Sequence, residues 1–395
     1  MSDLSATYYN PAACALLERP RFVFNLTSIE LANIDVAGAA GPGLDFDQLI
    51  FDIVPAMLAF HVGSHEEDGN HFAFAFLSRH DSDFDLGVSN VSVSPVSPTA
   101  DAGFGRVKQR VVEYWTGGTW SRRVSRRVSV GVSPFLAYRA QRSRRSLNVE
   151  DLTPGVSRAA FVGREQEYNH VRVLAKLGLA WRPGKWELGA TVTTPGLKLW
   201  ASGKTVFNAS VAGVDALPLL SASTQTGLPA TYHAPWSVAF GASRVFESTV
   251  VHTTFEWFSA VDSYDILTPE PAAIAGRPET IPLVYSGQAK SVANFGVGIE
   301  QRVGDYFHLY GGVARNASAF VPGRDAFSPW DLVDVTAGAS VDRGRLRLAV
   351  GLGYAWGDGM LPQVVVPPDF SGVPEPLPAH FSRWTISFGA SFQTE

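Results

Sequence analysis

The chain of 395 residues lacks any apolar run that approaches the length of a membrane-spanning helix. A helix needs about 18 or more consecutive apolar residues to cross a bilayer. Because every backbone polar group must be paired inside a membrane, the only remaining route into a bilayer for this chain is a closed β-barrel.

Cysteine is nearly absent, and charge of one sign does not dominate. The single Cys14 excludes an internal disulfide framework and a multi-cysteine metal site, and we interpret it as a small buried apolar residue. The 32 basic and 37 acidic residues are dispersed along the chain, for a net charge of -5. This pattern provides no field that would hold nucleic acid, so we expect no DNA or RNA partner.

Motifs of known chemistry are also missing. There is no Gly-x-Ser-x-Gly, no phosphate-binding glycine loop and no His-Glu-x-x-His. Six residues could be imagined as a metal site, although a solvated acidic turn fits them better: His61, His65, His71, Glu66, Glu67 and Asp68. We therefore expect no metal, no cofactor and no catalytic residues.

The sequence opens Met1-Ser2-Asp3-Leu4-Ser5 without a basic stretch followed by an apolar one, so no secretion signal is visible. This conflicts with an exported protein. Three explanations stay open: the signal was removed, the start was placed too late, or the protein is cytosolic.

What the chain does have is strict two-residue alternation, which is clearest from Arg345 to Trp356. One face carries Leu346, Leu348, Val350, Leu352, Tyr354 and Trp356. The other face carries Arg345, Arg347, Ala349, Gly351, Gly353 and Ala355. An apolar row that ends in aromatic residues, beside a row rich in small and polar residues, is typical of a lipid-facing barrel wall.

Similar strand-length patterns recur along the whole chain. The expected strands are Arg21–Val36, Val54–Val62, His71–Ser92, Val111–Arg123, Val128–Arg142, Tyr168–Trp181, Lys185–Ser202, Trp236–Phe246, Thr249–Asp262, Ala289–Arg302, Tyr306–Asn316, Leu332–Asp342, Arg345–Trp356 and Phe381–Phe392. Tight joins such as Arg343-Gly344 alternate with long connections rich in Pro, Gly, Ser and Asp, among them 93–110, 143–167 and 203–235. The pattern predicts an all-β, antiparallel up-and-down transmembrane barrel of about fourteen strands.

A soluble β-sandwich is the alternative architecture, because it also contains many short strands separated by turns. The placement of tryptophan argues against it. Six tryptophans fall near strand ends, where the interface girdles of a barrel lie: Trp181, Trp186, Trp200, Trp257, Trp356 and Trp384.

Residues 1–19 do not follow the alternation, so we divide the chain into an N-terminal segment (1–19) inside the lumen and a barrel (20–395). The stretch Ala6 to Ala13, with Asn10-Pro11-Ala12 at its centre, resembles a segment of the outer-membrane long-chain fatty-acid transporters of the FadL type. Stretches 176–183, 186–195, 234–243 and 255–259 are similar to strand patterns of the same family.

The resemblance implies passive uptake of hydrophobic molecules such as long-chain fatty acids across the outer membrane of a Gram-negative bacterium. In this family, outer loops collect the ligand, a pocket in the barrel holds it, and an N-terminal plug, the hatch, shifts. The ligand then leaves through a gap in the wall near the third strand. The implied hatch residues here are Asn10, Pro11 and Ala12. Only nine residues precede Asn10, so the implied hatch is a shortened one.

Two surface sites are expected from the residues. A connection after the seventh strand is unusually apolar and could capture ligand, although packing against neighbouring loops would explain it equally well: Val214, Leu217, Leu219, Leu220 and Leu228. Four arginines near the outer rim could contact lipopolysaccharide phosphates, with a solvated loop base as the alternative: Arg139, Arg142, Arg144 and Arg145.

We therefore expect a monomeric barrel in contact with outer-membrane lipid and lipopolysaccharide, whose partner is a hydrophobic small molecule. Two other functions stay open. A structural or adhesive barrel would have a lumen without a ligand pocket, and a barrel-embedded lipid hydrolase would need Ser and His together on the outer side of the wall.

Overall fold

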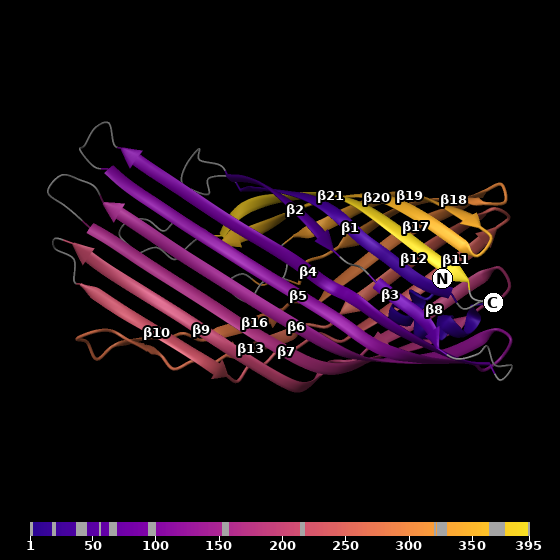
Figure 1. Cartoon of the computed structure of the whole chain (residues 1–395), viewed down its shortest axis with the longest axis horizontal. Helices are drawn as coiled ribbons and strands as arrows, with labels where there is room; N and C mark the ends of the chain where they lie inside the picture. The colour runs from indigo at the N-terminus through magenta and orange to yellow at the C-terminus, as the bar shows by residue number, and fades with distance from the viewer. Residues whose placement is uncertain are drawn as a thin grey trace.

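The computed structural model describes residues 3–17, 21–36, 46–54, 57–62, 69–93, 100–151, 158–213, 218–319, 321, 330–362 and 376–393 (Figure 1). The strands form a closed antiparallel barrel of 14 strands. Closure comes from the first strand, β1 (Arg21–Val36), which pairs along its length with the last, β21 (Pro376–Gln393). The predicted fold class and number of strands are confirmed.

Three of the barrel strands are interrupted, and each then carries two labels: β2 with β3, β8 with β9, and β10 with β11. The remaining elements of the wall and its rim follow in chain order. They are β2 (Phe46–Val54), β3 (Met57–Val62), β4 (Asn70–Val93), β5 (Ala100–Arg123), β6 (Val128–Asp151), β7 (Arg158–Trp181), β8 (Trp186–Thr193), β9 (Leu197–Gly213), β10 (Leu219–Leu228), β11 (Ser237–Phe246), β12 (Thr249–Phe258), β13 (Val261–Leu267), β14 (Ala272–Ala273), β15 (Thr280–Ile281), β16 (Tyr285–Ala289), β17 (Val292–Val303), β18 (Phe307–Asn316), β19 (Asp331–Arg343) and β20 (Leu346–Pro362).

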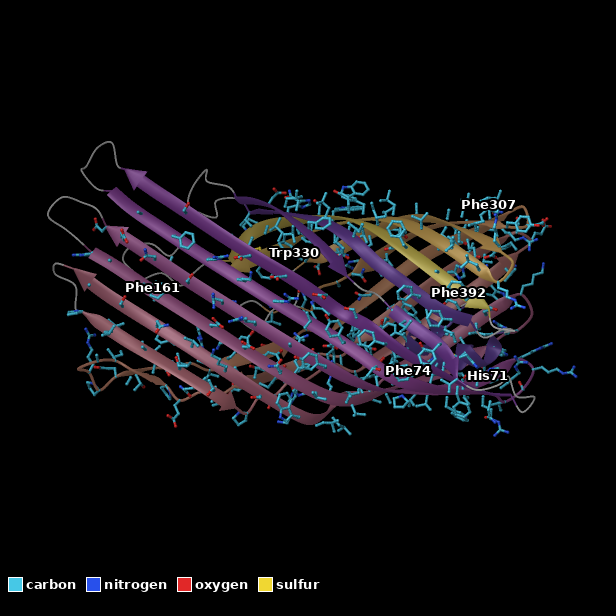
Figure 2. All side chains as sticks on the ribbon, in the orientation of Figure 1. His71, Phe74, Phe161, Phe307, Trp330 and Phe392 are labelled. Atoms are coloured by element: carbon cyan, nitrogen blue, oxygen red, sulfur yellow. The ribbon has the colours of Figure 1, made fainter. Side chains whose placement is uncertain are left out.

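Alternate side chains of the wall point outward and are apolar, as the sequence predicts. On β20, Leu348, Val350 and Leu352 each keep nearly half of their surface exposed, which would be unfavourable in water over so large a face. In Figure 2 the outward Phe307 and Phe392 lie at the end of the barrel that also holds both chain termini, whereas Phe161 lies toward the opposite end. Lipid acyl chains in contact with these outward apolar side chains would remove them from water.

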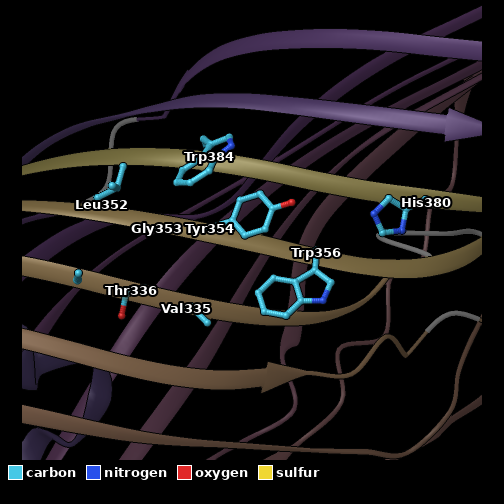
Figure 3. A pocket seen from close by; sticks show the side chains of 9 residues that line it. Val335, Thr336, Leu352, Gly353, Tyr354, Trp356, His380 and Trp384 are labelled. Carbon is cyan, nitrogen blue, oxygen red and sulfur yellow. The ribbon is translucent and has the colours of Figure 1, made fainter.

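Aromatic side chains gather on the wall midway along β20 and β21, where Tyr354 pairs with Trp384 (Figure 3). The rings of Tyr354 and Trp384 lie 4.6 Å apart and those of Tyr354 and Trp356 lie 5.5 Å apart. With Val335 and His380 they line a groove of about 550 Å³. Rings with one apolar and one polar edge suit the boundary between lipid and water, as expected for an interface girdle.

Strands β4 to β7 are 24 residues each, much longer than the expected ones, and in Figure 1 they extend, together with β9 and β10, well beyond the strands of the other half of the barrel. The prediction of long loops at 93–110, 143–167 and 203–235 is therefore wrong for most of these residues, which continue the ladders of β4 to β10. Polar and glycine-rich composition indicated a loop, but beyond the membrane a strand needs no apolar outer face.

The wall has an interrupted seam beside the first strand. β3 pairs with β4 from Met57 to Val62, whereas β2 pairs with β1 and, among the described residues, forms no ladder with β4. Between β2 and β3 the sequence is Pro55-Ala56. These two residues lie outside the described part of the chain.

The N-terminal segment (residues 3–17) contains the helix α1 (Ala6–Tyr9) and the 3-10 helix η1 (Pro11–Leu16). Within the described part of the chain, no helix combines the length and apolarity needed to cross a bilayer. η1 packs against β5, β6 and β7.

Candidate functional site

The N-terminal segment sits on three glycines that point into the lumen. Gly131, Gly178 and Gly189 come from β6, β7 and β8, and the register places Gly131 directly opposite Gly178. A Cβ added at Gly178 would lie 2.3 Å from Asn10 Oδ1, and one at Gly131 would lie 2.5 Å from the Pro11 carbonyl carbon. Only glycine leaves room for this approach.

Asn10 connects the segment to the wall and shapes its own turn. Its side-chain Nδ2 donates to the Leu179 carbonyl at 2.9 Å, and its Oδ1 accepts from the Ala12 N–H at 3.1 Å. The second bond caps η1 in the usual manner of asparagine. Pro11 then stands at the first position of η1, where its missing N–H costs nothing.

Side chains of the wall donate hydrogen bonds to several carbonyls of the segment. Ser133 Oγ donates to the Thr7 carbonyl at 2.8 Å and Ser129 Oγ to the Ala12 carbonyl at 2.7 Å. At the end of η1, the Arg123 and Arg182 guanidiniums donate to the carbonyls of Ala15 and Leu16. These bonds hold the segment at both ends.

Cys14 is buried in η1 against the wall, in agreement with its interpretation as a small buried residue. Burial raises the pKa of the Cys14 thiol to about 12, above the value of about 8.5 for an exposed cysteine. Because the thiolate is the reactive form, we expect a maleimide to label the folded protein very slowly at pH 8 and the urea-unfolded chain rapidly. Equal labelling rates would show that the segment is not seated.

Above the segment, a carboxylate bridges two arginines inside the barrel. Glu113 Oε1 lies 2.6 Å from Arg172 Nη2, and Glu113 Oε2 lies 3.3 Å from Arg139 Nη1. The Trp115 Nε1–H donates to the same carboxylate at 2.6 Å. All four side chains are buried. The ion pairs therefore offset the free-energy cost of burying the charges of Glu113, Arg139 and Arg172.

Tyr232 enters this charged group from the break between β10 and β11. Its ring lies 4.5 Å from the Arg139 Cζ and 4.9 Å from the Arg172 Cζ, which places both cations over an aromatic face. Tyr168 Oη accepts from Arg139 Nε at 3.0 Å. The interruption between β10 and β11 thus places the Tyr232 side chain in the lumen.

A cavity of about 360 Å³ lies between these elements. Its floor includes Tyr8 of the N-terminal segment, and Lys176 Nζ lies 4.5 Å above that ring. Arg79, Glu113, Tyr232 and Trp330 also line it. The lumen therefore contains an open cavity. A purely structural barrel would instead have a lumen filled by side chains.

An apolar cluster of inward side chains lies beside the interrupted seam. Its buried members are Ile34, Val36, Leu86, Val107, Trp330 and Ala379, and its partly buried members are Ile50, Phe84, Leu332, Leu377 and Phe381. Ile50 and Phe84 come from β2 and β4, the two strands that do not pair. Trp330 stacks on Phe381 at 5.3 Å and also lines the cavity, so the cavity and the seam share an apolar boundary.

The four arginines predicted at the outer rim separate into two groups. Arg139 lies fully buried in the lumen, so its proposed contact with lipopolysaccharide is wrong. The reason is strand parity, because odd positions of β6 point inward over this stretch. Arg142 and Arg144 are exposed, and both bind Glu165 on the outer face. Arg145 is exposed farther along β6.

The apolar connection after the seventh strand also differs from its prediction. Leu219, Leu220 and Leu228 belong to strand β10, so their assignment to a loop is wrong. Leu220 is exposed, whereas Leu219 and Leu228 pack against buried neighbours. Val214 and Leu217 lie outside the described residues. The apolar side chains here continue the alternation of a strand, which the proline and glycine around them concealed.

Inward charges on the other half of the barrel form cross-strand ion pairs, as expected for a braced wall. Arg347 Nη2 lies 2.6 Å from Asp342 Oδ2, and Arg383 Nη1 lies 3.3 Å from Glu30 Oε2. Ser243 Oγ lies 2.8 Å from His252 Nδ1. These two side chains also face the lumen, and a hydrolase in the wall would need such a pair on its outer side.

The histidines considered as a metal site do not assemble one among the described residues. His61 and His71 contact each other with ring centroids 6.2 Å apart. No group of three or more His, Cys, Asp or Glu side chains suitable for a metal occurs in the described ranges. His65, Glu66, Glu67 and Asp68 lie outside them.

Comparison with solved structures identifies proteins that have a similar fold. The chain is similar to the *Pseudomonas putida* toluene transporter TodX, with a TM-score of 0.64, 14% identity, and coverage of 99% of this chain and 94% of that one. It is similar to the monoaromatic hydrocarbon channel CymD, with a TM-score of 0.58, 13% identity, and coverage of 99% and 93%. It is also similar to a *Pseudomonas aeruginosa* FadL homologue, with a TM-score of 0.61, 12% identity, and coverage of 100% and 95%.

No protein-family model matches the sequence, and no curated protein matches it. The likeness is therefore one of fold over nearly the whole chain, and it confirms the fold that the resemblance to FadL-type channels implied.

Proposed function

We propose that this barrel is an outer-membrane channel for passive uptake of hydrophobic molecules, working as a single chain without a cofactor. The observation that carries the proposal is the continuity of three features: a cavity in the lumen, an apolar cluster on its boundary, and a seam without a ladder beside that cluster. The similar structures include a toluene transporter and a monoaromatic hydrocarbon channel, which supports the same class of ligand here.

The physical argument concerns where an apolar solute is stable. Such a solute gains about 25 cal/mol for each Å² removed from water. A route from the cavity along Trp330 and Phe381 to a lateral exit keeps the solute against apolar surface, so it reaches the membrane without crossing the aqueous periplasm. The exposed Leu220 and its neighbours on β10 are our candidate capture surface at the outer end.

The N-terminal segment would act as the hatch. Its Tyr8 forms part of the cavity floor. Two residues away, Asn10 lies against the inward Gly178 and Gly189, which together with Gly131 we call the glycine seat. A ligand that displaces Tyr8 would therefore act on the bonds that hold the segment. Each hydrogen bond between the segment and the wall is worth about 1 kcal/mol net. The binding free energy of a ligand can therefore offset the loss of such a bond.

The overall function is tested by uptake. Cells of a Gram-negative strain that lacks its own channel should accumulate a radiolabelled long-chain fatty acid or monoaromatic hydrocarbon faster when they produce this protein. Uptake of both compounds equal to that of cells with an empty vector would exclude the transport function and favour a structural barrel.

The lateral exit is tested by closing the seam. We expect a short bis-maleimide link in the variant Ile50→Cys/Phe84→Cys, made in a Cys14→Ser background, to reduce uptake by about tenfold or more, the effect of raising a barrier by about 1.4 kcal/mol. Both positions belong to the apolar cluster on the two strands that do not pair.

The matched control is Phe60→Cys/Phe74→Cys in the same background. These residues face each other where β3 and β4 are already joined by their ladder, with ring centroids 5.4 Å apart. The same link at this position should leave uptake unchanged. Equal uptake by both linked variants would place the exit elsewhere.

A further inference from the structure

We infer that the outward faces of β5 and β6 form a binding site for the phosphate groups of an anionic glycolipid, lipopolysaccharide, in the outer leaflet. The inference rests on the barrel standing in the outer membrane with its long strands outward, and it is independent of the transport function.

Five cations cluster on these two strands: Arg106, Lys108, Arg110, Arg142 and Arg144. The register pairs Lys108 directly with Arg144 and Arg110 directly with Arg142. Like charges in directly opposite positions destabilise a sheet. An anion placed over the four side chains would convert that repulsion into attraction.

Within the described residues, the acidic partners of this cluster lie at its sides. Asp83 and Asp85 approach it from β4, and Glu165 and Glu167 approach it from β7. The side chains of the cations keep 45% to 61% of their surface exposed, whereas those of the four carboxylates keep 12% to 38%. The cations therefore form the layer that an approaching molecule meets first.

The geometry of the arginines leaves donors for a second anion. Glu165 binds Arg142 and Arg144 through their Nε and Nη2 atoms. A guanidinium carries five N–H donors, so the Nη1 edge of each remains for another acceptor. Arginine in pairs suits phosphate because two parallel N–H bonds can form at once.

The height of the cluster matches a lipid headgroup. Tyr114 and Tyr138 are directly opposite each other on the outward face and mark the aromatic boundary of the wall. Arg110 and Arg142 follow four residues farther along, about 13 Å at 3.3 Å per residue. The side chains between the tyrosines and the tight turns are largely apolar, among them Leu136 and Trp120. Phosphates at the rim of the outer leaflet fall at the level of the cations.

The test measures binding of purified lipid A by native mass spectrometry on the full-length barrel in detergent. Lys108→Gln/Arg110→Gln should weaken binding by about tenfold or more, because two charge-assisted contacts are lost. This variant leaves Glu165 with both of its arginines. Arg142→Gln/Arg144→Gln is a second variant with the same expected direction.

The control variant is Arg126→Gln/Arg127→Gln, which removes the same charge from two exposed residues at the opposite end of the barrel. It should bind lipid A like the unchanged protein. Unchanged binding by both cluster variants would overturn the inference. So would equal binding of dephosphorylated lipid A, which would assign the contact to acyl chains, or full displacement by inorganic phosphate, which would indicate a site for small anions only.

Discussion

Gly178→Val is expected to unseat the N-terminal segment and to produce the largest change in lumen access of any single substitution. The new Cβ would lie 2.3 Å from Asn10 Oδ1 and 2.9 Å from the Ala12 nitrogen, so Asn10 must move and its bond to Leu179 is lost. Loss of two or three hydrogen bonds of about 1 kcal/mol each shifts the seated equilibrium by about 30-fold to 150-fold.

Two measurements follow that change. Maleimide labelling of Cys14 should accelerate by the same factor, and single-channel conductance in planar bilayers should rise because the lumen opens. Gly351→Val is the matched control, since its glycine also points inward but an added Cβ meets only Ala337 O at 3.9 Å. If Gly178→Val labels no faster than Gly351→Val, the glycine seat does not hold the segment.

Glu113→Gln is expected to destabilise the barrel by about 3–5 kcal/mol, because it removes the carboxylate charge that pairs with the buried Arg139 and Arg172. The measurement is the urea midpoint of unfolding from lipid vesicles, followed by the shift in gel mobility between folded and unfolded barrel.

Glu165→Gln makes the same chemical change at a carboxylate that also bridges two arginines, Arg142 and Arg144. These arginines are about half exposed, so water replaces the lost partner and the expected cost is about 1 kcal/mol or less. Similar midpoints for the two variants would mean that the lumen around Glu113 is wet enough to screen its charge.

Much of the wall could be predicted from the sequence. The alternation in 345–356 identified β20 and its lipid-facing row, and the short joins identified the hairpins: a join was predicted at Arg343-Gly344, and the turn between β19 and β20 is Gly344-Arg345. These signals are local, because side-chain direction along a strand repeats every two residues whatever the partner strand is.

Parity also explains one error. Arg139 and Arg142 were grouped by closeness in sequence, yet they differ by an odd number of positions on one strand and so lie on opposite faces. The alternation that identified the strand was sufficient to place Arg139 in the lumen. The extent of β4 to β7, in contrast, could not be found this way, because outside the membrane the outer face is polar and the apolar lipid-facing row that marked the other strands is absent, although inward residues such as Leu86, Val107 and Val149 stay apolar and buried.

By itself, the sequence determined that this chain is a barrel, how many strands it has, which rows face lipid, and that the described N-terminal residues 3–17 are not part of the wall. Only the tertiary structure decided which inward residues meet. Glu113 and Arg172 are 59 positions apart, and Asn10 bonds to Leu179 across 169 positions. Such pairs depend on the register between strands and on where a separate segment comes to rest, and no local period encodes either one.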